Sequence, residues 1–432
     1  MTKTIGQHIN MLNVSLDGQT VGVLAIDDQK RIWFEYSQNW IASGFNLAPK
    51  AMAFDAKPQL ARDNLFQGLH GAFSDSLPDG WGLLLMDREF KKRFDWKPYE
   101  VMPLDRLAYM GARSMGALEY APIYAQEPIS DKLDIASLAN SVDAILKGKE
   151  DEVITQLTIQ GGSPGGTRPK VTIARSESSD VCLSGFQILP EDYSHWIIKF
   201  KGEDDPEDMG QIERAYAELA NLAGVQMPRT DLIAVSKGGR LEHYFAVERF
   251  DREGKNGKRH VLSLAGFLYA NYRMPCLDYE GVLGSIAALT NDHSQIERGF
   301  RLMAFNVLAH NRDDHVKNFA FLFSKETGWK LSPAFDLTFS AGMGGEHMTS
   351  VSGKGHPVLQ DVLKVGGKFH IANALQIIGE VRCAVSQWTA IAKKWKLGDE
   401  SASMVQAAIS KVDKGFAEAP MKPYQASGRA KC

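Results

Sequence analysis

The sequence predicts an α+β protein, with a strand-rich first half followed by a mainly helical second half. Up to about residue 255, short apolar segments are separated by turn residues, which is typical of strands. After residue 260 the apolar residues mostly recur with the period of a helix, and only the run 318–323 has the pattern of a strand. Because 432 residues are too many for one ordinary core, we expect two or three packed units.

The expected division of the chain has four parts, at residues 1–125, 126–255, 256–420 and a loose tail at 421–432. In the first part, three short strands are expected between residues 10 and 36, with an Asp-Gly turn after the first of them. A helix is expected to begin near Trp81, with Ser76 or Asp79 as its cap, and to end in a basic last turn.

The second part opens with a helical stretch at 136–148 and contains several predicted strands. We expect strands at 153–159, 171–174, 195–200, 230–236 and 244–250. A glycine-rich stretch, GGSPGGTRPK, follows the first of them, and an acidic loop at 202–208 leads into a helix at 209–224. The apolar face of that helix is formed by Ile212, Ala215, Tyr216, Leu219 and Leu222.

Bulk composition argues against several classes of protein. Apolar residues make up 44% of the chain and charged residues 23%, as in soluble globular proteins. The net charge is −3, from 49 basic and 52 acidic residues, and no basic stripe is present, which disfavours direct binding to nucleic acid. The 4 cysteines lie far apart, so neither a zinc cluster nor a disulfide framework is expected. No secretory leader is visible and no apolar run approaches the ~20 residues that cross a bilayer, so we expect a cytoplasmic protein.

The densest polar cluster in the chain follows the apolar helical segment GFRLMAFNVLA. It comprises Asn311, Asp313, Asp314, His315, Lys317 and Asn318. Asp336 follows a short strand-like hairpin, in the sequence PAFDL. A helix that ends in such a run should present these side chains on a loop.

This set of side chains suits phosphoryl transfer, which needs metal ions on the phosphates and a carboxylate that orients the attacking hydroxyl. Asp313 is then the base, and Asn318 and Asp336 offer Mg²⁺ hard oxygen ligands. The alternative is that these residues merely cap helices and stabilise a loop. For Asn311 or Asp314 taken alone, that structural interpretation is preferred.

Two weaker signals precede this cluster. Lys199 ends an apolar strand, as a lysine that reaches ATP phosphates does, although a lysine there often only extends to solvent. Glu213 on the next helix is a candidate ion-pair partner, with Glu218 as the alternative. The glycine-rich stretch lacks the Lys-Ser/Thr of a Walker A loop, yet its backbone N–H groups can bind phosphates, with Arg168 and Lys170 adding charge. A flexible hairpin turn is an equally good interpretation.

Taken together, these segments resemble the HipA family of bacterial toxin serine/threonine kinases. Five segments occur in the family's order and at similar spacing, namely LPDGWG, WIIKF, AVERFDR, NRDDHVKN and SPAFD. The resemblance covers most of the chain and implies a HipA-like protein-kinase fold. It assigns residues 1–125 to an N-terminal subdomain, 126–255 to the kinase N-lobe and 256–420 to an all-helical C-lobe.

The resemblance also implies roles for individual residues. Asp313 corresponds to the catalytic aspartate, and Asn318 and Asp336 correspond to the Mg²⁺ ligands. The implied ATP-binding residues are Lys199, Glu248, Phe250, His315, Gly162, Gly165 and Lys170. Phe335 takes the aromatic place before the metal-binding aspartate.

The glycine-rich stretch corresponds to the family's phosphate loop, in which a serine autophosphorylates and inactivates the kinase. Ser163 is the only serine inside that stretch and is therefore the expected site of modification. The sequence GGSPGGTRPK departs from the commonest form of the loop, which leaves Thr158 as the alternative.

Partners follow from the same resemblance. Such kinases pair with a small DNA-binding antitoxin, HipB-like in this case, so contact with DNA would be indirect. The implied protein substrate belongs to the translation machinery, with glutamyl-tRNA synthetase as the precedent. Two other functions compete with the kinase. One is a kinase-fold binding module that assists a DNA-bound repressor, and the other is a metal-dependent hydrolase built on Asp313, Asp314, His310 and His315.

Overall fold

The computed structural model describes residues 6–62, 65–124, 132–148, 157, 168–179, 181–186, 188–254 and 256–425. The chain divides into two compact units. Unit 1 consists of Met1–Asp205, Ile233–Tyr269 and Leu322–Ser324, and unit 2 consists of Pro206–Leu232, Ala270–Phe321 and Lys325–Cys432. The four-part division expected from the sequence is finer than this split and stays a prediction.

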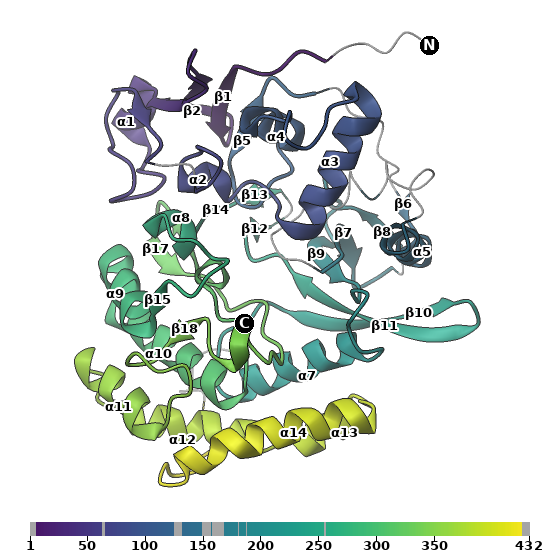
Figure 1. Ribbon diagram of the computed structural model, residues 1–432, viewed down its shortest axis with the longest axis vertical. Coiled ribbons are helices and arrows are strands. Elements are labelled where there is room, and N and C mark those ends of the chain that lie inside the picture. Colours follow the sequence, from purple (N-terminus) through teal and green to yellow (C-terminus); the bar gives the residue numbers. More distant parts are fainter. Residues whose placement is uncertain are drawn as a thin grey trace. The chain divides into compact units, whose positions relative to one another are not determined.

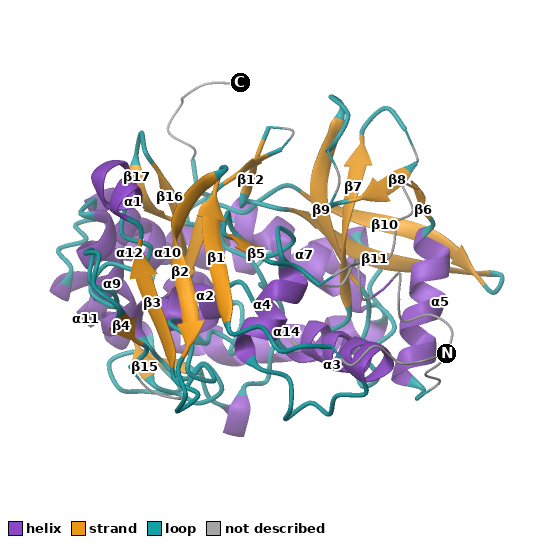
Figure 2. Ribbon diagram, turned by 90° about the horizontal axis from the view of Figure 1, so that it is seen from above, coloured by secondary structure: helices purple, strands orange, loops and turns teal. Residues whose placement is uncertain are grey.

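The first sheet of unit 1 has the strand order β4-β3-β2-β1-β5 (Figure 2). Its strands are β1 (Met11–Leu16), β2 (Gln19–Ile26), β3 (Ile32–Tyr36), β4 (Gln59–Leu60) and β5 (Glu119–Ala121). β1 and β2 form a hairpin through Asp17 and Gly18, which both adopt positive φ, as a tight two-residue turn requires. The three strands expected between residues 10 and 36 are therefore confirmed.

Four helices of unit 1 lie between β3 and β5 in the sequence. They are α1 (Gln38–Ser43), α2 (Gly71–Ser74), α3 (Gly80–Phe94) and α4 (Pro103–Met110). α3 begins after Asp79 and ends in a basic last turn, as expected from the sequence. Phe90 and Phe94 near its end pack in a cluster with Trp96 and Tyr109, so the second half of α3 is held by a small core.

The second sheet of unit 1 has the strand order β10-β11-β9-β7-β8-β6. Its strands are β6 (Lys132–Leu133), β7 (Lys170–Ser176), β8 (Cys182–Ser184), β9 (Tyr193–Lys199), β10 (Thr230–Lys237) and β11 (Arg240–Glu248). The helix α5 (Ile135–Leu146) and the start of α3 share a buried core with this sheet (Figure 1). The apolar runs of β7, β9 and β11 form strands because each sends buried side chains into that core.

One strand prediction in this region is wrong at the only residue that is described. Within the expected strand 153–159, Leu157 is helical, and it is fully buried in the core beneath the second sheet. A short apolar run cannot be assigned to strand or helix by its periodicity alone. Unit 1 is completed by β12 (Arg252–Glu253), β13 (Gly257–Lys258), β14 (His260–Ser263) and α8 (Leu264–Leu268).

Unit 2 is mainly helical, and Figure 1 shows α7, α12, α13 and α14 packed together. Its helices are α7 (Met209–Leu222), α9 (Tyr279–Thr290), α10 (His293–Leu308), α11 (Leu359–Lys368), α12 (Ala374–Val385), α13 (Trp388–Lys394) and α14 (Asp399–Asp413). Its strands are β15 (Leu277–Asp278), β17 (Gly328–Leu331) and β18 (Thr349–Ser350). The strand β16 (Ala320–Ser324) begins in unit 2, and its residues Leu322–Ser324 are counted with unit 1. The C-terminal part is thus mainly rather than entirely helical, and β16 confirms the strand expected at 318–323.

The helix α7 shows how the apolar face predicted from the sequence is used. Ile212, Tyr216 and Leu219 are buried, and the Tyr216 hydroxyl donates a hydrogen bond to the Ala309 carbonyl at 2.6 Å. Leu222 was expected on the same face, but it is 39% exposed because the helix ends there. Among the described residues, no helix combines the length and the apolar character needed to cross a membrane.

Candidate active site

The helix α10 positions the polar cluster of unit 2. Nearly all of its apolar residues are buried, so its C-terminal end is fixed in the core. The helix ends at Leu308, and His310 then adopts a left-handed conformation with φ of 56°. This reversal starts the loop 311–318, which carries the predicted catalytic residues.

Two adjacent aspartates in this loop have opposite environments. The Asp313 side chain is 57% exposed, whereas the Asp314 side chain is 0% exposed. Asp314 Oδ2 accepts hydrogen bonds from the Tyr279 hydroxyl at 2.8 Å and from His347 Nδ1 at 2.8 Å. The structural interpretation of Asp314 is therefore the right one, since a buried carboxylate bound on several sides fixes the loop.

Further buried contacts extend this anchor. Thr349 bonds Asp314 twice, through its backbone N–H to Oδ1 at 3.2 Å and through its hydroxyl to the backbone carbonyl. Asn306 Nδ2 donates to the Tyr279 hydroxyl at 2.9 Å, and Asn311 Nδ2 donates to Asn306 Oδ1 at 2.9 Å. Asn311 is thus also structural. Sequence reasoning missed Tyr279, Asn306 and Thr349, because they lie in three separate elements and form no local pattern.

The outward-facing part of the loop brings three predicted site residues together. Asn318 lies at the end of a short 3-10 turn and donates from Nδ2 to the Asp313 carbonyl at 2.8 Å. His315 Nε2 lies 4.0 Å from Asp313 Oδ1. His315 Nδ1 is buried and has no hydrogen-bond partner among the described residues. A buried nitrogen without a partner is costly, and a bound ligand would relieve that cost.

Asp336 reaches the same region of unit 2 through a separate segment. It follows the β16–β17 hairpin and has a left-handed φ of 57°, which aspartate tolerates better than most residues. Four residues later, Ser340 forms a parallel bridge with Asn311, and its N–H donates to the His310 carbonyl at 3.2 Å. The segment that carries Asp336 therefore runs beside the start of loop 311–318. The neighbouring Phe335 is half-buried.

The hydrolase interpretation finds no support in these contacts. His310 stacks on Phe339, and its Nδ1 is bonded to the Ser340 carbonyl at 3.1 Å. Burial lowers the pKa of His310 to about 4, and the nearby Arg312 adds to this effect. With Asp314 fully used as an anchor, the four proposed ligands do not converge. In the part of the chain that the structure describes, no group of three or more His, Cys, Asp or Glu side chains is arranged to hold a metal ion.

In unit 1, two predicted ATP-binding lysines lie on neighbouring strands. Lys170 on β7 and Lys199 on β9 are direct cross-strand partners, so both side chains project from the same face of the sheet. Phe245 on β11 is the partner of Lys199 on its other side, and the Lys199 ammonium lies 5.6 Å from the centre of that ring. Both predicted ATP-binding lysines therefore lie on one face of this sheet.

The glycine-rich stretch is described only at its end. Gly162, Ser163, Gly165 and the alternative Thr158 lie outside the described residues. Arg168 is described, and its guanidinium Nε donates to both carboxylate oxygens of Asp205 at 3.1 and 2.9 Å. The acidic loop at 202–208 thus orients the residue that follows the glycines.

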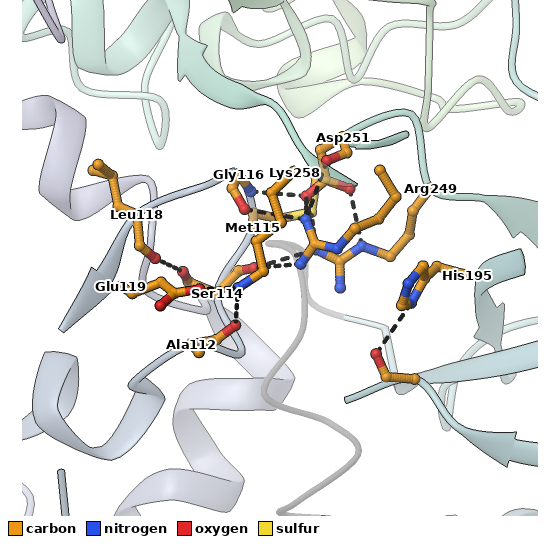
Figure 3. A network of polar contacts seen from close by, with 12 residues as sticks. Ala112, Ser114, Met115, Gly116, Leu118, Glu119, His195, Arg249, Asp251 and Lys258 are labelled. Carbon is orange, nitrogen blue, oxygen red and sulfur yellow. Dashed lines mark hydrogen bonds and ion pairs between the residues drawn. The ribbon is translucent and has the colours of Figure 1, made fainter. Parts of the chain in front are cut away.

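Glu248 and Phe250, the predicted adenine-binding residues, lie at the end of β11 and just after it. Both are half-buried, whereas Arg249 and Asp251, which alternate with them, are fully buried. Figure 3 shows Arg249 bonded to Asp251. Sequence reasoning missed the buried pair, although alternation with a period of two would have placed it on the opposite face.

Glu213 and Glu218, the two candidate ion-pair partners of Lys199, have different surroundings. Glu218 in unit 2 accepts hydrogen bonds from Lys394 Nζ at 2.7 Å and from the Trp395 indole at 2.8 Å, so it serves to hold α13 against α7. Glu213 is buried on α7. The pairing of Lys199 with Glu213 stays a prediction.

Comparison with known protein families gives two matches. The HipA-like C-terminal domain matches residues 162–412, and the HipA N-terminal domain matches residues 12–121. The first match alone covers more than half of the chain. Together the two matches include every segment that carried the resemblance seen in the sequence.

Individual relatives are more distant. A candidate kinase of Haemophilus influenzae is 23% identical over 189 residues, which cover 39% of this chain and 55% of that protein. The candidate kinase Y4dM of Sinorhizobium fredii is 26% identical over 152 residues, which cover 33% of this chain and 36% of that protein. The chain therefore matches about half or less of the length of these curated relatives.

Among solved structures, a chain of the Shewanella oneidensis toxin–antitoxin complex of HipA, HipB and operator DNA is similar over nearly its full length. The TM-score is 0.66 at 17% sequence identity, with 93% of this chain and 95% of that chain covered. This likeness establishes a HipA-like fold for the chain.

Proposed function

The chain belongs to the HipA family, and we propose that it is an ATP- and Mg²⁺-dependent serine/threonine protein kinase that serves as the toxin of a toxin–antitoxin pair. The arrangement of loop 311–318 carries this proposal. An exposed Asp313 and the side chain of Asn318 are presented by a backbone that the buried Asp314 holds in place. An exposed carboxylate on a fixed loop suits transfer of a phosphoryl group to a protein hydroxyl.

In the proposed reaction, Asp313 accepts the proton of a serine or threonine hydroxyl. The hydroxyl oxygen forms a bond to the γ-phosphorus of ATP, and the bond from that phosphorus to the β,γ-bridging oxygen breaks, so that ADP leaves. A general base of this kind contributes roughly 10²- to 10⁴-fold to the rate. The fixed loop adds to this because the base need not be ordered during the reaction.

The metal ligands proposed for Mg²⁺ fit its chemistry. Because Asn318 Nδ2 is bound to the Asp313 carbonyl, its amide oxygen is the atom turned toward a ligand. Asp336 contributes a carboxylate, and Mg²⁺ prefers such oxygen ligands together with substrate phosphates. When it is bound with ATP, Mg²⁺ neutralises the charge that develops on the transferred phosphoryl group.

The proposed nucleotide-binding residues of unit 1 supply positive charge and a backbone edge. Lys170 and Lys199, which lie on one face of the sheet, contact the phosphates. Glu248 and Phe250 meet the adenine. In unit 2, the buried Nδ1 of His315 forms a hydrogen bond with bound ATP, as donor or acceptor according to the tautomer of the ring.

Regulation is proposed at the glycine-rich stretch. Gly162 and Gly165 bind phosphate through their N–H groups, and Ser163 is the autophosphorylated residue, with Thr158 as the alternative. A phosphate adds about −1.5 to −2 charges. The phosphates of ATP repel this charge, so the modified loop moves away from them. The modified protein would then be an inactive kinase.

The proposed partners are a small HipB-like antitoxin and, through it, DNA. The Shewanella complex contains HipA, HipB and operator DNA together, which supports a partner of this class. The net charge of −3 argues that the basic surface is supplied by that partner. We place the substrate in the translation machinery, with an aminoacyl-tRNA synthetase such as glutamyl-tRNA synthetase as the resemblance suggests, and the site of action in the cytoplasm.

The competing proposal is a kinase-fold module that binds its antitoxin and has little activity. The presence of Lys199, Asp313, Asn318 and Asp336 favours the enzyme, since a binding module needs none of them. ATP binding and phosphotransfer separate the two, because only the enzyme requires both.

The test is to incubate the purified protein, freed of pre-existing phosphate, with Mg²⁺ and γ-labelled ATP, and to map phosphate by mass spectrometry. Label on Ser163 or a neighbour should appear in the wild type and be lost in Asp313→Gln. Asp28→Asn, an exposed carboxylate in a turn of unit 1, is the matched control and should label normally. ATP binding without any label would favour the binding module, and failure to bind ATP would refute the kinase.

A further inference from the structure

The segment that follows β11 has two faces with different roles. Glu248 and Phe250 alternate with Arg249 and Asp251, and the latter two side chains are 0% exposed. The Arg249 N–H donates to the His195 carbonyl at 2.8 Å, which continues the pairing of β11 with β9 by one residue. The face opposite the proposed adenine-binding residues is therefore completely buried.

Arg249, Asp251 and Arg252 form a buried clamp, of which Figure 3 labels Arg249 and Asp251. Arg249 binds Asp251 with two parallel hydrogen bonds, from Nε to Oδ1 at 2.9 Å and from a terminal nitrogen to Oδ2 at 2.7 Å. Arg252 donates to the same Oδ2 at 2.7 Å. Such bidentate pairs fix orientation as well as adding energy.

The clamp forms hydrogen bonds with a loop of the N-terminal domain, which lies more than a hundred residues earlier in the chain. The Gly116 N–H donates to Asp251 Oδ2 at 2.8 Å, and Arg252 donates back to the Gly116 carbonyl at 3.1 Å. Arg249 and Arg252 each donate to the Ser114 carbonyl at 3.2 Å. Gly116 has a φ of +76°, so a residue with a side chain would be strained there.

Other contacts secure the same junction. Lys258 Nζ donates to the Ala112 carbonyl at 3.0 Å and to Glu119 at 2.6 Å. Further along, His260 Nε2 is bonded to the Leu47 carbonyl at 2.9 Å, and Ser263 donates to Asp75 from both its N–H and its hydroxyl at 2.6 Å. The whole segment after β11 is thus bonded to the N-terminal domain at several points.

The net charge of the clamp explains why it requires backbone carbonyls from loop 112–116. Two guanidinium groups surround one carboxylate in a buried site, which leaves an excess of one positive charge. Burial alone would raise the pKa of Asp251, but Arg249 and Arg252 outweigh it and hold that pKa well below its usual range. Burial lowers the pKa of Arg252 to about 10, and the repulsion from Arg249 acts in the same direction. The Ser114 and Gly116 carbonyls therefore stabilise charge that the clamp cannot neutralise itself.

We propose that the N-terminal domain positions the nucleotide, because its loop 112–116 fixes the backbone of residues 248–250 through Arg249 and Asp251. These two are positioning residues, which act through Glu248 and Phe250 and do not touch ATP. The inference rests on the proposed kinase function. It goes beyond that function by giving the N-terminal domain a part in nucleotide affinity.

The test compares full-length variants by direct ATP binding, steady-state kinetics and thermal unfolding. Asp251→Asn keeps the shape of the side chain but removes its charge. We expect its Kd and KM for ATP to rise about tenfold while kcat changes less than about threefold, because adenine contacts contribute equally to ground and transition states. Asp251→Glu should recover part of the loss. Glu253→Gln, an exposed carboxylate on the same hairpin, is the control and should match the wild type.

A purely structural clamp would lower the unfolding temperature and leave the Kd of the folded fraction unchanged, and that outcome overturns the proposal. If Asp251→Asn does not fold, Lys258→Met decides, because Lys258 is partly exposed and holds the same loop. A rise of about threefold in its Kd for ATP supports the proposal, and an unchanged Kd overturns it. A wild-type protein that binds no ATP would instead refute the kinase function itself.

Discussion

A buried aspartate fixes the backbone both of loop 311–318 in unit 2 and of segment 248–252 in unit 1. The two aspartates are bonded to different kinds of partner. Each segment alternates outward residues with a buried aspartate, Asp314 in one and Asp251 in the other. Asp314 is held by Tyr279, the first residue of α9, and by the β18 region, all within the mainly helical unit. Asp251 is held by a loop that lies 135 residues earlier in the chain. The residues proposed for chemistry are therefore supported within unit 2, and those proposed for adenine depend on a loop in the part of unit 1 that matches the HipA N-terminal domain.

The largest expected effect tests whether the chemistry depends on unit 2. In Asp336→Asn we expect kcat for phosphotransfer to fall about a thousandfold, since a metal contributes several kcal/mol to the transition state. Asparagine adopts the left-handed conformation of Asp336 as readily as aspartate does, so folding should be unaffected. Initial rates across a Mg²⁺ titration, together with thermal unfolding, measure both quantities. A folded variant with wild-type kcat at every Mg²⁺ concentration would show that Asp336 is not part of the active site.

The next effect distinguishes the two adjacent aspartates. Asp314→Ala should lower the free energy of unfolding by about 3 kcal/mol, because buried donors on Tyr279 and Thr349 lose their acceptor. The matched variant Asp313→Ala should change it by less than about 0.5 kcal/mol, because that side chain is largely exposed. Urea denaturation of both proteins gives the comparison. Equal losses would mean that Asp313 also anchors the loop.

Sequence reasoning identified loop 311–318 because its residues are contiguous, and the first sheet because alternation and an Asp-Gly turn are local signals. It did not identify the partners of Asp314, since Tyr279 and Thr349 are each 35 residues away. Only the chain path brings them together. Asp314 was still interpreted as structural, because a single polar residue in a loop usually is.

The segment AVERFDR shows which contacts in unit 1 could not be predicted from the sequence. The family resemblance implies that Glu248 and Phe250 in this segment bind ATP. The intervening Arg249 and Asp251 have stronger physical constraints, because both are fully buried charges. Their partner loop contributes backbone atoms of Ser114 and Gly116, and backbone contacts leave little trace in a sequence.

The smallest effect concerns pH and the junction in unit 1. Burial lowers the pKa of His260 to about 4, so the folded protein holds this ring neutral, bonded to the Leu47 carbonyl. In the unfolded chain the pKa is about 6.5. The stability that depends on neutral His260 is therefore fully present above pH 6.5 and is lost as the pH falls toward 4. Between pH 7.5 and pH 5 this residue should account for a loss of about 2 kcal/mol.

His260→Gln provides the check, because glutamine can donate to the Leu47 carbonyl and does not titrate. Its free energy of unfolding, measured by urea denaturation at pH 7.5 and pH 5, should fall less on acidification than that of the wild type. His293→Gln, at the exposed start of α10 in unit 2, is the control and should retain the full loss. If all three proteins lose the same stability, the acid-sensitive group lies elsewhere. If His260→Gln is protected and His293→Gln is not, the junction that ties the N-terminal domain to the segment after β11 is one part of the fold that acid weakens.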